Sequence, residues 1–253
     1  DKTQSVGAAR PKVTTAQDSQ YMAAVNRGDM EAAQKLVDDA AKATGYTVGP
    51  VYHGTDAVFD VFDFPEIGFH FAANPELAIN ASVKSGKRDP SAKPFYLNMK
   101  NVVDIEGSFG GFRARHVLED LHKRNIINKD EFNRAEDRYY EIEDNFESDT
   151  QFNAANAALI NGLLKNKGID GLRYWNEFDA GLNTQGTGLD VNPDWSYIAL
   201  QPNQIKSADP VTYNDAGNVM PLSERFDATK DSVLRAARPT KPEGVGEDEK
   251  LRR

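Results

Sequence analysis

The chain has 253 residues, a length that suits one or two domains. Its 39 acidic and 30 basic residues give a formal net charge of −9, which argues against a general nucleic-acid binder, because such proteins need basic groups to neutralise phosphates. Cysteine is absent, which excludes disulfides, thiolate catalysis and cysteine-ligated zinc. No apolar run approaches 18 residues, so the sequence predicts no membrane span and no membrane partner.

The two ends of the chain differ from its middle. Residues 1–17 lack periodicity and are expected to form a disordered lead-in. In residues 18–45, two short apolar faces flank Asn26-Arg27-Gly28-Asp29, which predicts an antiparallel helical pair that Gly45 closes. Residues 46–226 are expected to form the main domain, and the charged residues 227–253 a disordered tail.

Short strands dominate the first part of the main domain. Val51-Tyr52-His53 predicts a strand that Gly54 ends, and Gly68-Phe69-His70-Phe71-Ala72 predicts a second one. A helix is expected from Pro75 to about Ser85, because Asn74 suits the N-cap and proline the first helical turn. Further strands are expected at 94–99 and 102–105.

A helical insertion of about residues 112–167 divides the strands into two groups. Its pattern predicts helices at about 112–124, 129–147 and 150–167. Strands return at 171–175 and 197–200, and again around 211–213 and 219–220, with a Gly-rich loop at 179–194. This order predicts an α+β fold.

The first chemical motif is Tyr52-His53-Gly54-Thr55. A histidine at a strand end can hydrogen-bond a sugar hydroxyl, and the following glycine lets a ligand approach the main chain closely. The alternative is a turn with a structural histidine. In the next strand, His70 points away from the face of Phe69 and Phe71, so it either lines a cleft or faces solvent.

The second chemical segment spans residues 170–208. Two strands there flank a polar loop that could present a carboxylate to a cleft, from Glu177, Asp179, Asp190 or Asp194. The alternative is an ordinary hairpin. His116 and His122 lie in the charged helical block without metal-ligand spacing, so no metal site is expected. The motifs of P-loop, Rossmann and α/β-hydrolase proteins are absent.

In this order, the segments resemble the ADP-ribosyltransferase fold on its diphtheria-toxin and poly(ADP-ribose) polymerase side. The matching text is Tyr52-His53-Gly54-Thr55, Gly68-Phe69-His70-Phe71-Ala72, and Ser196-Tyr197-Ile198-Ala199-Leu200 before Gln204-Ile205. It is most similar to the transferase-like domains of phage and mobile-element polyvalent proteins. The resemblance covers roughly residues 50–226.

The resemblance implies two small, mostly antiparallel sheets with a cleft for NAD+ between them. His53 would hold the adenosine ribose, and the main chain of Gly54 would meet the nicotinamide amide. The other residues implied at the NAD+ site are Tyr52, Thr55, Gly68, Phe69, His70 and Phe71.

The sequence departs from the family at two positions. The family's stacking tyrosine falls near Ala81, so Tyr52, Phe69 or Tyr174 would have to replace it. The family's catalytic glutamate falls on Ser196, which cannot stabilise positive charge as a carboxylate does. Asp179 is the preferred replacement, with Glu177 and Asp194 behind it.

The expected function is NAD+-dependent mono-ADP-ribosylation of a macromolecular acceptor, protein rather than nucleic acid, by a toxin-like protein or phage effector. One alternative is a catalytically inactive transferase fold that serves as a binding module in a phage or mobile-element protein. Another is an unrelated α+β protein whose motifs match by chance. The oligomeric state and the compartment stay open, the choice being a soluble cytoplasmic protein or a delivered effector.

Overall fold

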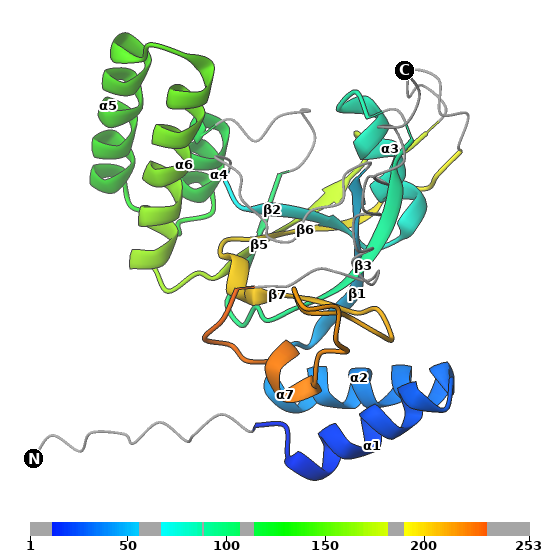
Figure 1. Cartoon of the computed structure of the whole chain (residues 1–253). Helices are drawn as coiled ribbons and strands as arrows, with labels where there is room; N and C mark the ends of the chain where they lie inside the picture. Colours follow the sequence, from blue (N-terminus) through cyan, green and yellow to red (C-terminus); the bar gives the residue numbers. More distant parts are fainter. Residues whose placement is uncertain (1–11, 56–66, 88, 107–113, 182–189, 232–253) are drawn as a thin grey trace, which may run out of the picture.

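Figure 1 shows a computed structural model of the chain, which describes residues 12–55, 67–87, 89–106, 114–181 and 190–231. Most of the expected lead-in and most of the expected tail lie outside these residues. Among the described residues, no helix is long and apolar enough to cross a membrane.

The expected helical pair is present at the N-terminal end. Helix α1 (Thr15–Asn26) begins three residues earlier than expected, because Thr14 and Gln17 form a capping box. Helix α2 (Met30–Thr44) is capped by Asp29 and ends at Gly45, whose φ of 94° lies in the left-handed region. The buried side of the pair packs against the 208–226 part of the chain and Tyr96.

The strands form one seven-stranded sheet, in the order β4-β5-β6-β2-β1-β3-β7. Strands β4 and β5 are parallel and the other neighbours are antiparallel. The α+β class is therefore confirmed, whereas the expectation of two separate sheets is wrong. The strands are β1 (Val48–Thr55), β2 (Phe69–Ala72), β3 (Ser91–Leu97), β4 (Val102–Ile105), β5 (Gly171–Asn176), β6 (Asp194–Ala199) and β7 (Ile205–Ser207).

The sheet is nearly divided at the junction between β1 and β2. Within the described residues, the register of these strands consists of the pair Tyr52 and Ala72. By contrast, β2 pairs with β6 along its whole length, and β1 pairs with β3 to the end of the strand at Thr55. The sheet thus has two halves, β4-β5-β6-β2 and β1-β3-β7, which join at one short contact.

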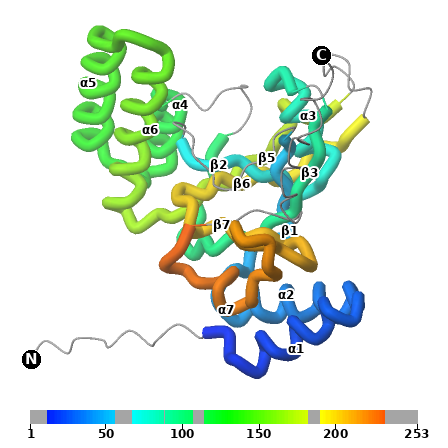
Figure 2. Tube along the Cα trace, viewed as in Figure 1, coloured from blue at the N-terminus to red at the C-terminus, as the bar shows by residue number. Residues whose placement is uncertain are grey.

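The remaining helices cover one face of the sheet and one end. Helix α3 (Pro75–Lys84) is N-capped by Asn74 as expected and packs on β1, β2 and β3. The insertion forms α4 (Ala114–Lys123), α5 (Lys129–Asn145) and α6 (Asp149–Asn166), close to the expected bounds. Figure 2 shows the insertion and the α1–α2 pair at opposite ends of the molecule.

The C-terminal part of the described chain is mostly irregular. A 3-10 turn, η1 (Pro202–Gln204), precedes β7, and the short helix α7 (Leu222–Arg225) returns to the N-terminal pair. The strands expected around 211–213 and 219–220 are reduced to one bridge between Tyr213 and Val219.

Candidate active site

The strand pairing divides the expected site residues between the two faces of the sheet. Ser196 pairs with Tyr174 and with Ala72, and Ala72 pairs with Tyr52, so these side chains share the face that α3 and the insertion cover. We call it the helix-covered face. Alternation places His70 on this face and His53 on the opposite one.

His53 bridges the junction between the two halves of the sheet. Its Nδ1 lies 2.9 Å from the main-chain oxygen of His70. Because a carbonyl oxygen only accepts, Nδ1 donates and Nε2 is the acceptor nitrogen of the ring. Burial lowers the pKa of His53, so the imidazole is neutral near pH 7. The side chain is partly exposed, and its ring centroid lies 5.8 Å from that of Phe71.

His70 packs against Tyr174, and its side chain is only partly exposed. The two rings meet edge to face with centroids 6.2 Å apart, and the His70 Nδ1 lies 3.4 Å from the Tyr174 hydroxyl. Burial, with a smaller contribution from His53, lowers the pKa of His70 to about 4. Tyr174 is 6% exposed, so its ring offers little face for stacking on a ligand.

Gly54 is fixed by the approach of α3. A Cβ atom at this position would lie 2.0 Å from the carbonyl oxygen of Ala78 and 2.9 Å from the Cβ of Ser82. On the side where a Cβ would point, the close approach that glycine permits is therefore made by α3. Thr55 is buried beyond it, and Ala81 is partly buried in α3.

The remaining expected NAD+-site residues lie around the β1–β2 junction. Tyr52 packs beside Ala72 and Leu77 beneath α3. Phe71 is buried with its ring 5.4 Å from Phe95, and Phe69 is partly buried in the same cluster. Gly68 precedes β2 at φ 77°, where a side chain would collide with the Ala199 carbonyl.

Asn176 brings Asp179 back to Ser196. Strand β5 ends at Asn176, whose Oδ1 accepts a hydrogen bond of 3.0 Å from the main-chain nitrogen of Asp179. The Nδ2 of Asn176 donates to the Asp179 carboxylate at 2.8 Å and to the Ser196 hydroxyl at 3.0 Å. We call residues 176–179 the Asp179 turn. It places a carboxylate next to Ser196, the position at which the resemblance implies a glutamate.

The charge on Asp179 is set by opposing effects. Burial raises the pKa of its carboxyl group, whereas the Asn176 hydrogen bond and the Lys84 ammonium, 3.9 Å away, act to lower it. Burial and the nearby Asp179 charge both raise the pKa of Tyr174, so its phenol stays protonated.

The other carboxylates are placed less suitably. Glu177 and Asp190 are exposed. Asp194 accepts from the Asn74 side chain at 3.2 Å and from the Trp195 main chain at 2.7 Å, so it supports the start of α3. The structure therefore brings Asp179, among these four, beside Ser196. Among the described residues, no group of three His, Asp or Glu side chains could hold a metal ion.

Sequence reasoning missed three residues that organise this site. Asn176 begins the Asp179 turn and bonds its carboxylate, and Asn80 and Lys84 contact the turn from α3. An asparagine at a strand end with an aspartate three residues later is a turn signal that could have identified Asn176. The pair Asn80 and Lys84 has i, i+4 spacing on one helix, but nothing in the sequence shows what that face contacts.

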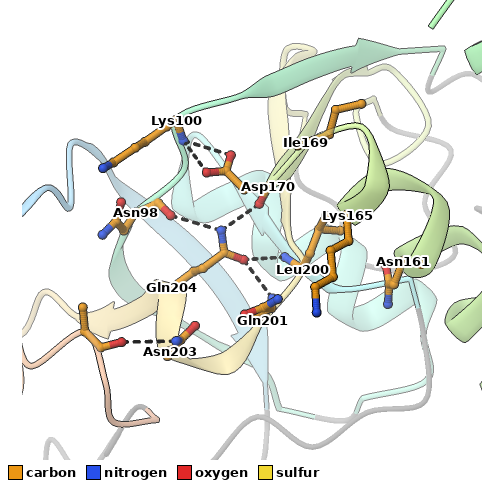
Figure 3. Close-up of a pocket in the computed structure, with 13 residues that line it drawn as sticks. Asn98, Lys100, Asn161, Lys165, Ile169, Asp170, Leu200, Gln201, Asn203 and Gln204 are labelled. Carbon is orange, nitrogen blue, oxygen red and sulfur yellow. Dashed lines mark hydrogen bonds between the residues drawn. The ribbon is translucent and has the colours of Figure 1, made fainter. Parts of the chain in front are cut away.

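A separate groove of about 450 Å³ lies at the other end of β5 and β6 (Figure 3). Gln204 occupies its centre: its Oε1 accepts from the main chain of Leu200 and Gln201, and its Nε2 donates to the main-chain oxygens of Asn98 and Asp170. These bonds hold chain segments together. None of the expected site residues lines the groove, so we place the candidate site elsewhere.

The two histidines predict acid sensitivity. The unfolded chain has ordinary histidines with a pKa near 6.5, so it takes up protons before the folded chain as the pH falls. His70 alone should destabilise the fold by up to about 3 kcal/mol between pH 6.5 and 4. Urea unfolding at several pH values should show that the free energy of unfolding falls less steeply with falling pH in His70→Gln than in the unmodified protein. Equal slopes would contradict the buried neutral state of His70.

One protein family matches most of the chain. The family described as ADP-ribosyltransferase in polyvalent proteins matches residues 47–214, which include the whole sheet and the helical insertion. The fold is thus that of an ADP-ribosyltransferase domain. The chain belongs to the ADP-ribosyltransferases of polyvalent proteins, which confirms the resemblance and excludes a chance match of motifs. No curated protein and no solved structure matches the chain.

Proposed function

We propose that the protein transfers ADP-ribose from NAD+ to a macromolecular acceptor as a mono-ADP-ribosyltransferase. Family membership supports ADP-ribosyltransferase-like activity in general. The observation that carries the proposal is the Asp179 carboxylate beside Ser196, because it restores a negative charge where the family's glutamate is missing.

The groups of the site suit the parts of NAD+ that matter for the reaction. His53 is a neutral, partly exposed imidazole, a type of side chain that can hydrogen-bond a ribose hydroxyl. Cleavage of the bond between the nicotinamide ribose and nicotinamide passes through an oxocarbenium-like state, which the Asp179 carboxylate would stabilise. Nicotinamide leaves with the bonding electrons, and a nucleophile of the acceptor forms the new bond to the ribose.

His53 and Asp179 reach one region from opposite faces of the sheet. Ser196 pairs with Ala72, and Ala72 pairs with Tyr52, the residue before His53. The β1–β2 junction is short here, and His53 already spans it to His70. We therefore place NAD+ at this junction, between the two halves of the sheet.

A second candidate function is an inactive transferase fold that acts as a binding module in a phage or mobile-element protein. Two observations favour it. Ser196 replaces the glutamate, and Asp179 is already engaged by Asn176 and Lys84. In addition, α3 fills the space beside Gly54 on the helix-covered face.

NAD+ binding is the direct test of the proposal. Binding to the native state raises the unfolding temperature by mass action, so NAD+ should stabilise the unmodified protein in a dose-dependent way. His53→Ala removes a hydrogen bond worth about 0.5–1.5 kcal/mol, which corresponds to a roughly 2- to 13-fold weaker affinity. Calorimetric titration of both proteins measures this ratio.

His122→Ala is a matched control for this experiment. His122 also bonds a main-chain oxygen through Nδ1, that of Ile127 at 3.2 Å, but it lies in the helical insertion. The affinity of His122→Ala for NAD+ should equal that of the unmodified protein. Transfer of label from NAD+ to protein, compared with RNA, then identifies the acceptor class. Binding without turnover favours the binding module, and no binding contradicts both the NAD+ site and the transferase.

A further inference from the structure

The Asp179 turn is held from two sides. On the sheet side, Asn176 bonds both the main chain and the carboxylate of Asp179. On the other side the turn faces α3, which is anchored at its start by Asn74 and Asp194. The carboxylate therefore lies between a strand end and a helix.

Two residues one helical turn apart in α3 contact the turn. The Nδ2 of Asn80 donates to the main-chain oxygen of Asp179 at 3.1 Å. The ammonium of Lys84 donates to the main-chain oxygen of Phe178, lies 3.9 Å from the Asp179 carboxylate, and lies 4.1 Å from the centre of the Phe178 ring. The helix thus engages the main chain, the carboxylate and the neighbouring aromatic ring.

The burial of these groups separates them from ordinary surface pairs. The Lys84 side chain is 20% exposed and the Asp179 side chain 13%, whereas most other ion pairs among the described residues are formed by more exposed groups. Asn80 is fully buried, and its Oδ1 has no hydrogen-bond partner among the described residues.

We propose that α3 positions the carboxylate of the transferase: Asn80 fixes the main chain of the Asp179 turn, and the Lys84 ammonium holds the Asp179 side chain from the helix side. We call the contacts of Asn80 and Lys84 with the Asp179 turn the clamp. The role of the carboxylate rests on the proposed function, but the clamp itself does not. Lys84 and Asn80 are positioning residues, because both act through Asp179.

Two groups act to lower the pKa of Asp179 against its burial: the Asn176 hydrogen bond, which has the larger effect, and the Lys84 ammonium. Lys84 of α3 is the cation next to it, Tyr174 of β5 stays protonated, and Asp194 of β6 is engaged by Asn74. His70 of β2 contacts Tyr174, and burial lowers its pKa to about 4. Without Lys84, burial would act on the carboxyl group with only the Asn176 hydrogen bond to oppose it.

Titration of the Asp179 carboxyl carbon by NMR tests the clamp without any need for activity. The signal is assigned with Asp179→Asn. Removal of a cation at this distance should move the titration midpoint of Asp179 upward in Lys84→Met. Lys84→Arg should restore the midpoint. Lys123→Met removes a lysine from the exposed pair with Glu106, and it should leave the midpoint unchanged.

The acid side of the pH profile of kcat/KM for NAD+ is the second readout. It should move with the NMR midpoint in Lys84→Met and return in Lys84→Arg, which a merely structural role would not produce. An unchanged midpoint in Lys84→Met overturns the clamp even if the protein turns over NAD+. A shifted midpoint in a protein without turnover supports the clamp and contradicts the transferase. If Lys84→Met does not fold, Lys84→Gln, which keeps a donor for Phe178, gives the same readout.

Discussion

Asp179→Asn should lower NAD+ turnover about 10²- to 10³-fold, the usual effect of removing one preorganised electrostatic group from an active site. The carboxylate would oppose the positive charge that develops on the ribose as nicotinamide leaves. The asparagine keeps an oxygen that can accept from Asn176, so the turn should survive while the charge is lost. Release of labelled nicotinamide measures turnover, and thermal unfolding checks the fold.

The other carboxylates decide whether the effect belongs to Asp179. Asp144→Asn, on the exposed side of α5, is the neutral control. Glu177→Gln and Asp194→Asn test the competing assignments. If one of these shows the large loss while Asp179→Asn retains turnover, the carboxylate of the reaction has been assigned wrongly.

Gly54→Ala should destabilise the fold by about 1–3 kcal/mol, the range typical of overpacking in a well-packed region. The added Cβ would lie 2.0 Å from the Ala78 carbonyl, so α3 must move away from β1. Because α3 also contacts the Asp179 turn through Asn80 and Lys84, the same substitution should reduce NAD+ turnover. Urea unfolding of the variant measures the first effect.

Gly162→Ala is the matched control, and it should stabilise the fold where Gly54→Ala destabilises it. Gly162 lies within α6 with nothing inside 4 Å of an added Cβ, so alanine should stabilise the protein by about 0.5–1 kcal/mol. If Gly54→Ala is as stable as the unmodified protein, the close packing of α3 on β1 is wrong. The site would then have room for a ligand beside Gly54.

Local sequence signals located most of the elements. Asn74 and Pro75 marked the start of α3, and Gly45 marked the end of α2, because caps depend on residues adjacent in the chain. The three helices of the insertion followed from apolar spacing within a few residues of their observed bounds. The family resemblance also followed from short, ordered motifs.

Such local signals do not predict which strands pair when they lie far apart in the chain. The sequence could not show that β2 lies between β1 and β6, or that the two halves of the sheet join at Tyr52 and Ala72. Strand order depends on which edges meet during folding, and many orders satisfy the same alternation of apolar residues. For the same reason, the sequence placed His53 and Asp179 in one cleft without showing that they come from opposite faces.

The sequence by itself determined the fold class, the family and the residue types available for chemistry, since these depend on composition and on order along the chain. Only the tertiary structure decided which residues meet: His53 with His70, and Asp179 with Asn176, Ser196 and Lys84. Lys84 and Asp179 are far apart in the chain, and their contact depends on how α3 docks on the sheet. The charge of the Asp179 carboxylate depends in turn on that docking, because burial and a neighbouring cation shift its pKa in opposite directions.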